Sequence, residues 1–463
     1  MQQRSPSALT TLLNLAWPII LARATQSVVG FCDALMVAPL GHNALAATTT
    51  GALNTFAFII FPFGTVFILQ SFAAQLRGRG TLEAIPRYAY YGLLIAVFAG
   101  LLPIIGLPLL PWAFAKLGYS PEVRELLFQY MSIRALSVAA AVGAEAIGNW
   151  YGGLGNTRLS MVVGVTTMII NVIGCYVLIE PRFGLPGYGV AGSAWAAVIA
   201  TWSGFLVALA ALLTGTGYRE IVPVVKVPWR SLRKVEFLRV LRFGLPSGVN
   251  WFLEFSAFAL FVNAIVTHLG TTTLAAFNVM IQINSVSFMP AFGLASAGAV
   301  LVGEAIGRRA LSEVPRSVKL TIAVAAAWML CVGTLYLLIP EYLVGLFTSR
   351  SGEDTGELLR IGTLMLMISA VWQVFDAIGM TLSEALRAAG DTTWCMVARI
   401  VLAWGCFVPG AWFAIFVQHG GIGSVMLALA SYIGLSSLAF GFRFLQGRWR
   451  NIDLVGAEAD LVG

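Results

Sequence analysis

The sequence predicts an all-α integral membrane protein, with twelve transmembrane helices arranged as two pseudo-symmetric six-helix lobes around a central cleft. Three observations predict this fold class: the composition, a series of long apolar segments, and an internal repeat. Of the 463 residues, 59% are hydrophobic and only 11% are charged, whereas about a quarter of the residues in soluble domains are charged. Too few polar residues remain to cover a water-facing surface, which excludes a soluble enzyme, a disordered scaffold and a disulfide-stapled secreted domain.

Twelve apolar segments are each long enough to cross a hydrocarbon core of about 30 Å, which takes about 20 helical residues. We expect helices at 12–38, 44–74, 88–115, 123–150, 159–179, 188–213, 240–268, 273–306, 318–347, 358–386, 394–417 and 422–445. The first segment is too long for the apolar region of a cleavable signal, so it is expected to remain. Only short connectors separate the segments, and no soluble domain is expected.

Lys and Arg residues are concentrated in every second connector, most densely in the segment from Arg219 to Arg242. The positive-inside rule therefore predicts that these connectors and both chain termini are cytoplasmic. The net charge of +7 then reflects cytoplasmic loops, so no nucleic-acid partner is expected. Short loops without sorting elements favour a multi-pass protein of the cell inner membrane.

An internal repeat divides the chain into two halves. Residues 15–18 (LAWP) recur as 243–246 (FGLP), residues 40–47 (LGHNALAA) recur as 269–276 (LGTTTLAA), and Pro62 recurs as Pro290. We expect an N-terminal lobe at 1–218 (helices 1–6), a cytoplasmic linker at 219–238, and a C-terminal lobe with a short cytoplasmic tail at 239–463 (helices 7–12). Because each half has an even number of helices, both lobes share one orientation, which is typical of alternating-access transporters. A duplicated channel or scaffold is the alternative.

Several motifs in this frame resemble a known family. Pro18, Gln26 and Asp33 precede Leu40-Gly41 in the first helix, Glu254 ends the run LPSGVNWFLE, and residues 376–392 follow the pattern of a tenth helix. Together they resemble the multidrug and toxic compound extrusion (MATE) transporters over essentially the whole chain, and in the C-terminal lobe the branch of bacterial sodium-coupled and eukaryotic-type members. The resemblance implies an antiporter that exports organic, often cationic, compounds (drugs or toxic metabolites) in exchange for H+ or Na+.

Two carboxylates of the C-terminal lobe are the strongest candidates for the coupling-ion or proton site. An ionisable group near mid-membrane costs several kcal/mol unless it faces protein or water, so Glu254 and Asp376 are functional candidates. Asn250 and Gln373 each lie about one turn earlier on the same helix face as a carboxylate. Such oxygen ligands suit Na+, while a poorly solvated site would favour a protonated carboxyl group. A purely structural pairing of both carboxylates with a buried Arg is the alternative.

Asp33 is the candidate of the N-terminal lobe. Gln26 lies two turns earlier on the same face. Pro18 lacks an N–H and permits a helix bend, and Pro246 is its counterpart in the second half. The resemblance implies that protonation of Asp33 is associated with bending at Pro18.

The N-terminal lobe also departs from the family pattern. Asn171 matches an Asn of the fifth helix, but Cys175 stands where an Asp or Asn is common. Arg23 lies within the first helix and cannot be deprotonated, so it needs a carboxylate or water. We expect a structural ion pair with Glu145, and Asn149 lies one helical turn after Glu145. If Arg23 instead faced the cleft, anionic or zwitterionic substrates would be favoured.

Other functional classes have weaker support. The three His residues lie near predicted outer helix ends, and no HExxH or GxSxG motif occurs, so an enzyme is not expected. A flippase for a lipid-linked or anionic amphiphilic substrate is the main alternative. Glu384 and Arg387 are expected to form a pair on a helix surface. No cofactor beyond the coupling ion is expected, and the protein is expected to be a monomer that binds a small organic molecule.

Overall fold

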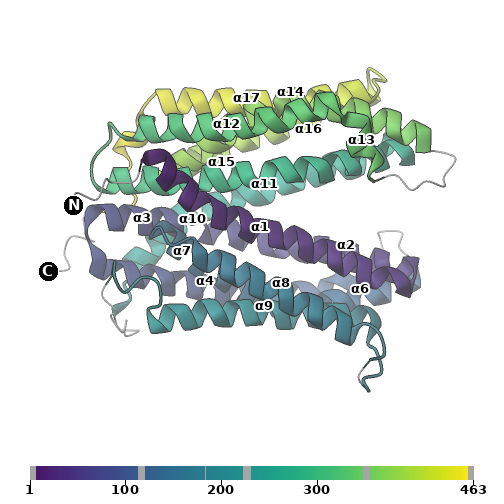
Figure 1. Ribbon diagram of the computed structural model, residues 1–463, viewed down its shortest axis with the longest axis horizontal. Helices are drawn as coiled ribbons and strands as arrows, with labels where there is room; N and C mark the ends of the chain where they lie inside the picture. The colour runs from purple at the N-terminus through teal and green to yellow at the C-terminus, as the bar shows by residue number, and fades with distance from the viewer. Residues whose placement is uncertain (1–6, 113–119, 183, 223–230, 348–354, 457–463) are drawn as a thin grey trace. The chain divides into compact units, whose positions relative to one another are not determined.

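The computed structural model describes residues 7–112, 120–182, 184–222, 231–347 and 355–456. Within these residues the only regular secondary structure is helical, and no β-strand occurs. The α-helices are α1 (Ala8–Val37), α2 (His42–Val66), α3 (Leu69–Arg79), α4 (Ile85–Gly106), α6 (Pro121–Arg134), α7 (Val138–Gly153), α8 (Arg158–Leu178), α9 (Gly189–Thr214), α10 (Lys234–Leu260), α11 (Thr271–Gly307), α12 (Val314–Leu338), α13 (Pro340–Gly345), α14 (Thr355–Ala388), α15 (Thr392–Ile400), α16 (Val408–Phe416) and α17 (Ile422–Leu445) (Figure 1).

These helices form 12 apolar spans that are long enough to cross a membrane, which confirms the predicted fold class. Several of the helices that were predicted as single elements are interrupted. A π-helical segment (Phe261–Ile265) follows α10, and α12 ends at Leu338 before α13 begins at Pro340. Helices α2 and α3 are separated at Phe67 and Ile68, a 3₁₀ turn joins α6 to α7, and a π-helical segment (Val401–Phe407) joins α15 to α16. Hydrophobicity fixes the length of a span, but it does not report where the hydrogen-bond pattern changes from i+4 to i+3 or i+5.

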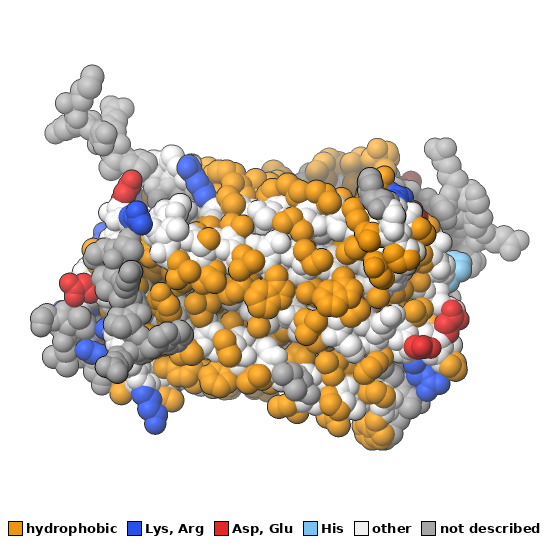
Figure 2. All heavy atoms as spheres, turned by 90° about the horizontal axis from the view of Figure 1, so that it is seen from below, with side chains coloured by type: hydrophobic (Ala, Val, Ile, Leu, Met, Phe, Trp, Pro, Cys, Tyr) orange, Lys and Arg blue, Asp and Glu red, His pale blue; other side chains and the backbone are white. Residues whose placement is uncertain are grey.

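The lateral surface is apolar, as a protein in lipid requires. In the face drawn in Figure 2, hydrophobic side chains cover the region between the two ends, and the charged side chains gather at the ends. Large apolar side chains such as Ile105, Leu338 and Leu445 are 71%, 71% and 85% exposed. Such exposure would favour aggregation in water, whereas lipid tails cover it in a membrane.

Contacts divide the chain into two compact units. The C-terminal unit contains Met1–Ile20 and Val249–Leu454, and the N-terminal unit contains Leu21–Gly248 and Val455–Gly463. Both divisions fall two residues after a repeat-related proline, Pro18 in α1 and Pro246 in α10. Each of these two helices is therefore divided between the units. The start of α1 belongs to the C-terminal unit and the rest of α1 to the N-terminal unit, whereas the start of α10 belongs to the N-terminal unit and the rest of α10 to the C-terminal unit. The lobe boundaries inferred from the repeat remain a prediction, and residues 223–230 of the predicted linker lie outside the described residues.

In the N-terminal unit, close backbone approaches hold the helices together. Helices α8 and α9 pack side by side (Figure 1). A β-carbon added at Gly153 of α7 would lie 2.4 Å from the carbonyl oxygen of Gln70 in α3. The first part of α10 packs equally closely on α2, because a β-carbon at Gly248 would lie 2.5 Å from the carbonyl oxygen of Phe61. Glycine at these positions allows contacts that any side chain would prevent.

The same unit contains a buried polar cluster at the start of α10. The Glu236 carboxylate accepts hydrogen bonds from Arg87 Nη2 at 2.9 Å and from the Tyr91 hydroxyl at 2.7 Å. Only 4% of Glu236 and 7% of Arg87 is exposed. A buried charge is tolerated when it is paired and hydrogen-bonded, so this cluster anchors the start of α10 to α4.

The C-terminal unit is built around α14, which packs against α11, α12 and α17. Near the end of α14, Arg387 donates to Glu384, but only 6% and 8% of these side chains is exposed. The predicted pairing is therefore present, whereas the prediction that it lies on a helix surface was wrong. The sequence shows the spacing of the two residues, but it does not show which helices cover them.

Candidate functional site

An ion pair inside the membrane spans forms the centre of the candidate site in the C-terminal unit. Arg399, in the last turn of α15, donates through Nη1 to the Glu254 carboxylate of α10. The same Nη1 donates to the Tyr432 hydroxyl of α17 at 3.3 Å. The guanidinium carbon lies 5.2 Å from the centre of the Phe440 ring, also on α17. Three helices thus hold this one cation.

The alternative of a pairing with a buried Arg is thus met for Glu254, and Arg399, which the sequence pattern did not single out, is the Arg. A guanidinium remains charged at any physiological pH, so within a span it requires a carboxylate or water. The side chain of Arg399 is 16% exposed and that of Glu254 is 39% exposed. The available signal was an Arg in an apolar span, because such a residue predicts a carboxylate partner on another helix.

Asp376 of α14 belongs to the same cluster. Its carboxylate lies close enough to Arg399 and Glu254 to interact electrostatically with both. Residues 254 and 376, which were selected separately from the sequence, are therefore brought together. Arg399 donates a hydrogen bond to Glu254. Asp376 interacts with the same guanidinium only electrostatically and, in the described part of the chain, is not part of an ion pair.

The two amides predicted beside the carboxylates differ in their surroundings. Asn250 is 8% exposed, and within the described part of the chain its Oδ1 atom has no hydrogen-bond partner. Gln373 instead donates to Asn284 of α11 at 2.6 Å, and Asn284 donates to Ser369 at 3.2 Å. Gln373 therefore belongs to an amide network between α11 and α14, while Asn250 offers a buried acceptor one turn before Glu254 on α10.

The N-terminal unit holds a second polar cluster around Asp33. The thiol of Cys175 donates to Asp33 Oδ1 at 3.2 Å, and the Arg134 guanidinium interacts electrostatically with this carboxylate. Asn171 joins the cluster through Cys175, whose thiol lies 4.0 Å from Asn171 Oδ1. Cys175 thus takes a polar role at the position where an Asp or Asn was expected, although a thiol is a weak donor. Gln26 is exposed and makes no such contact in the described residues.

Arg23 lies in a separate ion pair of the same unit. Its Nη2 atom donates to Glu145 Oε1 at 2.6 Å, and Asn149 Nδ2 donates to the same oxygen at 3.2 Å. Each side chain of the ion pair is 15% exposed. The predicted ion pair is therefore confirmed, and the charge of Arg23 is neutralised within its own unit. Helices α1 and α10 continue through Pro18 and Pro246, and the predicted bends there remain predictions.

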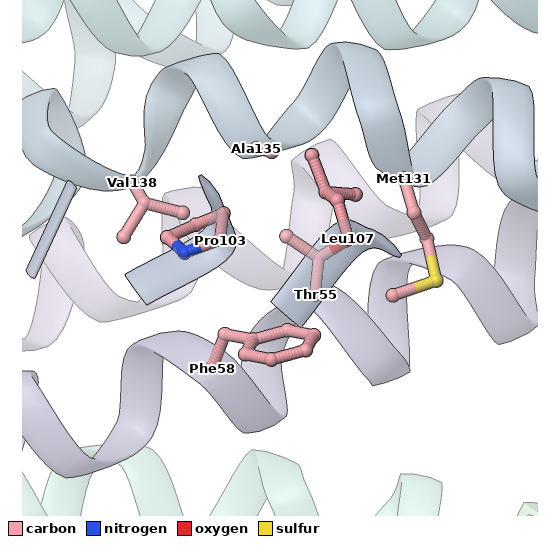
Figure 3. A pocket seen from close by; sticks show the side chains of 7 residues that line it. All are labelled: Thr55, Phe58, Pro103, Leu107, Met131, Ala135 and Val138. Carbon is pink, nitrogen blue, oxygen red and sulfur yellow. The ribbon is translucent and has the colours of Figure 1, made fainter. Parts of the chain in front are cut away.

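A small apolar pocket also lies in the N-terminal unit, away from these charges. Figure 3 shows its lining by Thr55, Phe58, Pro103, Leu107, Met131, Ala135 and Val138. Its volume of about 10 Å³ for a water-sized sphere holds roughly one water molecule. It is too small for an organic substrate.

In the described part of the chain, no three His, Cys, Asp or Glu residues are grouped so that they could hold a metal ion. The C-terminal cluster offers two carboxylates, and Arg399 donates to Glu254 and interacts electrostatically with Asp376. This donor set is suited to binding a proton or an organic cation at Asp376.

Residues 18–177 and 246–413 match the MatE family, and each matched stretch begins at one of the two repeat-related prolines. The chain belongs to the MatE family. Members of this family are membrane transporters and not enzymes, which confirms the predicted resemblance and the predicted class. Because the two matched stretches fall on the two repeats, the family pattern covers both halves of the chain.

Individual relatives cover nearly the whole chain. A probable multidrug resistance protein NorM from Rhizobium meliloti (strain 1021) is 28% identical over 457 residues, which cover 95% of this chain and 94% of that protein. The outward-facing structure of a multidrug resistance MATE family transporter of the MOP superfamily has a TM-score of 0.86 at 21% identity, with 97% and 98% of the two chains covered. A MOP superfamily transporter from Pyrococcus furiosus has a TM-score of 0.86 at 20% identity, with 96% and 98% covered. At these identities the two structures show the shared fold.

Proposed function

We propose that this protein is a secondary active antiporter that exports organic, cationic compounds, such as drugs or toxic metabolites, in exchange for H+ or Na+ by alternating access. The observation that carries the proposal is the cluster of Glu254, Asp376 and Arg399 within the membrane spans. Charged groups in a span are costly and mark ion or substrate pathways. The name of the Rhizobium meliloti relative, a probable multidrug resistance protein, supports the same substrate class.

The proposed roles follow from the surroundings of each residue. Asp376 and Glu254 exchange the coupling ion in the C-terminal unit, and Asn250 supplies a neighbouring acceptor. Asp33 is the proposed second proton site. Further polar support comes from Gln373, Gln26, Asn171 and Glu145, and the proposed bends lie at Pro18 and Pro246.

The charge balance favours a cationic substrate. Arg399 is paired with Glu254, Arg23 is paired with Glu145, and Arg134 interacts with the Asp33 carboxylate, so each of these guanidinium groups already lies beside a carboxylate. Asp376 adds a second carboxylate next to the Arg399–Glu254 pair, and Asn250 adds a hydrogen-bond acceptor. An ammonium group or a delocalised organic cation complements these groups, while the alternative of a flippase for anionic amphiphiles would need an available Arg.

The remaining proposals concern the protein in its membrane. We place the protein in the cell inner membrane as a multi-pass monomer with both termini in the cytoplasm, and we place the division between the lobes at the linker 219–238. Cysteine labelling from either side of sealed vesicles tests this orientation. Labelling of a Cys introduced at Ser231 from the outside would contradict it.

Efflux from proteoliposomes tests the proposed function. Ethidium movement is measured under an imposed proton gradient and, separately, under an imposed sodium gradient, for wild type, Glu254→Gln, Asp376→Asn and Asp33→Asn. We expect movement under one gradient for wild type and its loss in both C-terminal variants. Failure of both gradients to move ethidium would refute the antiporter proposal.

A further inference from the structure

The cluster of Glu254, Asp376 and Arg399 contains its own permanent cation. Arg399 donates to Glu254 and to the Tyr432 hydroxyl, and the Phe440 ring lies beneath its guanidinium carbon. Contacts from two other helices therefore hold the side chain in place. Since the guanidinium does not lose its proton in proteins, this positive charge is present in every state of the transport cycle that keeps these contacts.

A sodium ion does not fit beside this charge. Na+ requires several oxygen ligands, but Glu254 is engaged by Arg399 and Gln373 is engaged by Asn284. For a cation about 5 Å from a guanidinium, Coulomb repulsion at an effective dielectric constant of about 20 weakens binding roughly a hundredfold. Among the side chains of this cluster, the remaining oxygen ligands for Na+ are the Asp376 carboxylate and the Oδ1 atom of Asn250. These are too few to compensate for the repulsion.

A proton avoids this conflict. When Asp376 accepts a proton, its negative charge is neutralised and no further cation is placed near Arg399. The other titratable groups of the cluster are Glu254 on α10, Cys395 on α15 and Tyr432 on α17. Helix α11 contributes the neutral amide of Asn284, which is bonded to Gln373. Of the two carboxylates, Glu254 is the one held in an ion pair, so Asp376 is left as the exchangeable proton acceptor.

We propose that Arg399 is the residue that determines ion specificity: it takes the place of a coupling metal ion on Glu254, excludes Na+ from the cluster, and makes this antiporter proton-coupled through Asp376. The inference rests on the proposed function and deepens it by naming the coupling ion. Arg399 acts through Glu254 and Asp376 and is a positioning residue for ion exchange.

The test measures sodium and proton responses separately. Radioactive sodium binding to purified protein and ethidium transport in proteoliposomes are compared for wild type, Arg399→Gln, Arg399→Lys and Arg23→Gln. The Arg23 variant is the matched control, because it removes an Arg that is also paired with a carboxylate inside a span. Size-exclusion chromatography confirms that each variant is folded.

We expect wild type to transport ethidium under a proton gradient and to show no response to sodium. Arg399→Gln should gain sodium binding by about a hundredfold, whereas Arg399→Lys, which keeps the charge, and Arg23→Gln should gain none. Two results would overturn the inference. One is sodium-driven ethidium transport by wild type, and the other is a folded Arg399→Gln protein that does not bind sodium. Either result would leave the proposed function intact. Should Arg399→Gln not fold, the sodium response of wild type and of Arg399→Lys still decides. If neither gradient moves ethidium, the proposed function itself fails.

Discussion

Removal of one partner of the Glu254–Arg399 pair should destabilise the protein more than removal of both. Glu254→Gln leaves the Arg399 guanidinium without its carboxylate, and Arg399→Gln leaves Glu254 without its cation. Breaking a fully buried pair costs about 3–5 kcal/mol. Because 39% of the Glu254 side chain is exposed, water compensates in part, and we expect about 2 kcal/mol for each single variant.

The double variant removes both charges and leaves two neutral amides, so it should be close to wild type in stability. For a chain of 463 residues, a difference of about 2 kcal/mol corresponds to roughly 2 °C in the midpoint of thermal unfolding. We would measure this midpoint by heating detergent-purified protein and quantifying the folded fraction by size-exclusion chromatography. The double-mutant cycle then gives the coupling between the two residues.

The matched control is the pair of Glu180 and Arg182, whose side chains are 38% and 32% exposed and which lies outside the spans. Its cycle should give a coupling of about 0.5 kcal/mol or less. If the destabilisation of Glu254→Gln and Arg399→Gln simply added in the double variant, the two residues would not act as a pair, and the reasoning would be refuted.

Three further predictions follow from the described contacts. Glu236→Gln should lower stability by about 3 kcal/mol because it leaves the buried Arg87 unneutralised. Tyr91→Phe removes the hydrogen bonds of the hydroxyl to Glu236 and to the backbone of Arg233 but keeps the charge pair, so it should cost less, about 1–2 kcal/mol; thermal unfolding distinguishes them, and equal effects would contradict the charge argument. Gly153→Ala should lower the unfolding midpoint because the added β-carbon would lie 2.4 Å from the Gln70 carbonyl oxygen, whereas Gly152→Ala, with no atom within 4 Å, should not; a stable Gly153→Ala protein would show that α3 and α7 can separate. Asp33→Asn should slow ethidium efflux without abolishing folding, and unchanged efflux would remove Asp33 from the proposed site.

The membrane architecture could be predicted from the sequence because it depends on properties that the sequence displays directly. Each span must be apolar over about 20 residues, and the repeat of Pro18 as Pro246 shows that the chain is duplicated. The interruptions within spans could not be predicted in this way. The π-helical segment at Val401–Phe407 consists of apolar residues and glycine, as α16 after it does apart from one proline, so its composition does not mark it.

The candidate site was predictable in part. Ionisable residues in apolar spans are conspicuous, so Glu254, Asp376 and Asp33 could be selected without a structure. The partners could not be selected, because Glu254 and Arg399 are separated by 145 residues and meet only through helix packing. Asn284 was missed for the same reason, since an amide in a span has no charge to mark it.

The most direct measurement of the central claim is proton release on substrate binding. Ethidium is added to purified transporter in weakly buffered detergent solution that contains a pH-sensitive dye, and wild type is compared with Asp376→Asn. We predict that wild type releases protons as the organic cation displaces them from Asp376, and that the Asp376→Asn protein binds ethidium without this release. Equal proton release from the two proteins, or no release from wild type that binds ethidium, would contradict the claim that Asp376 exchanges a proton for the substrate.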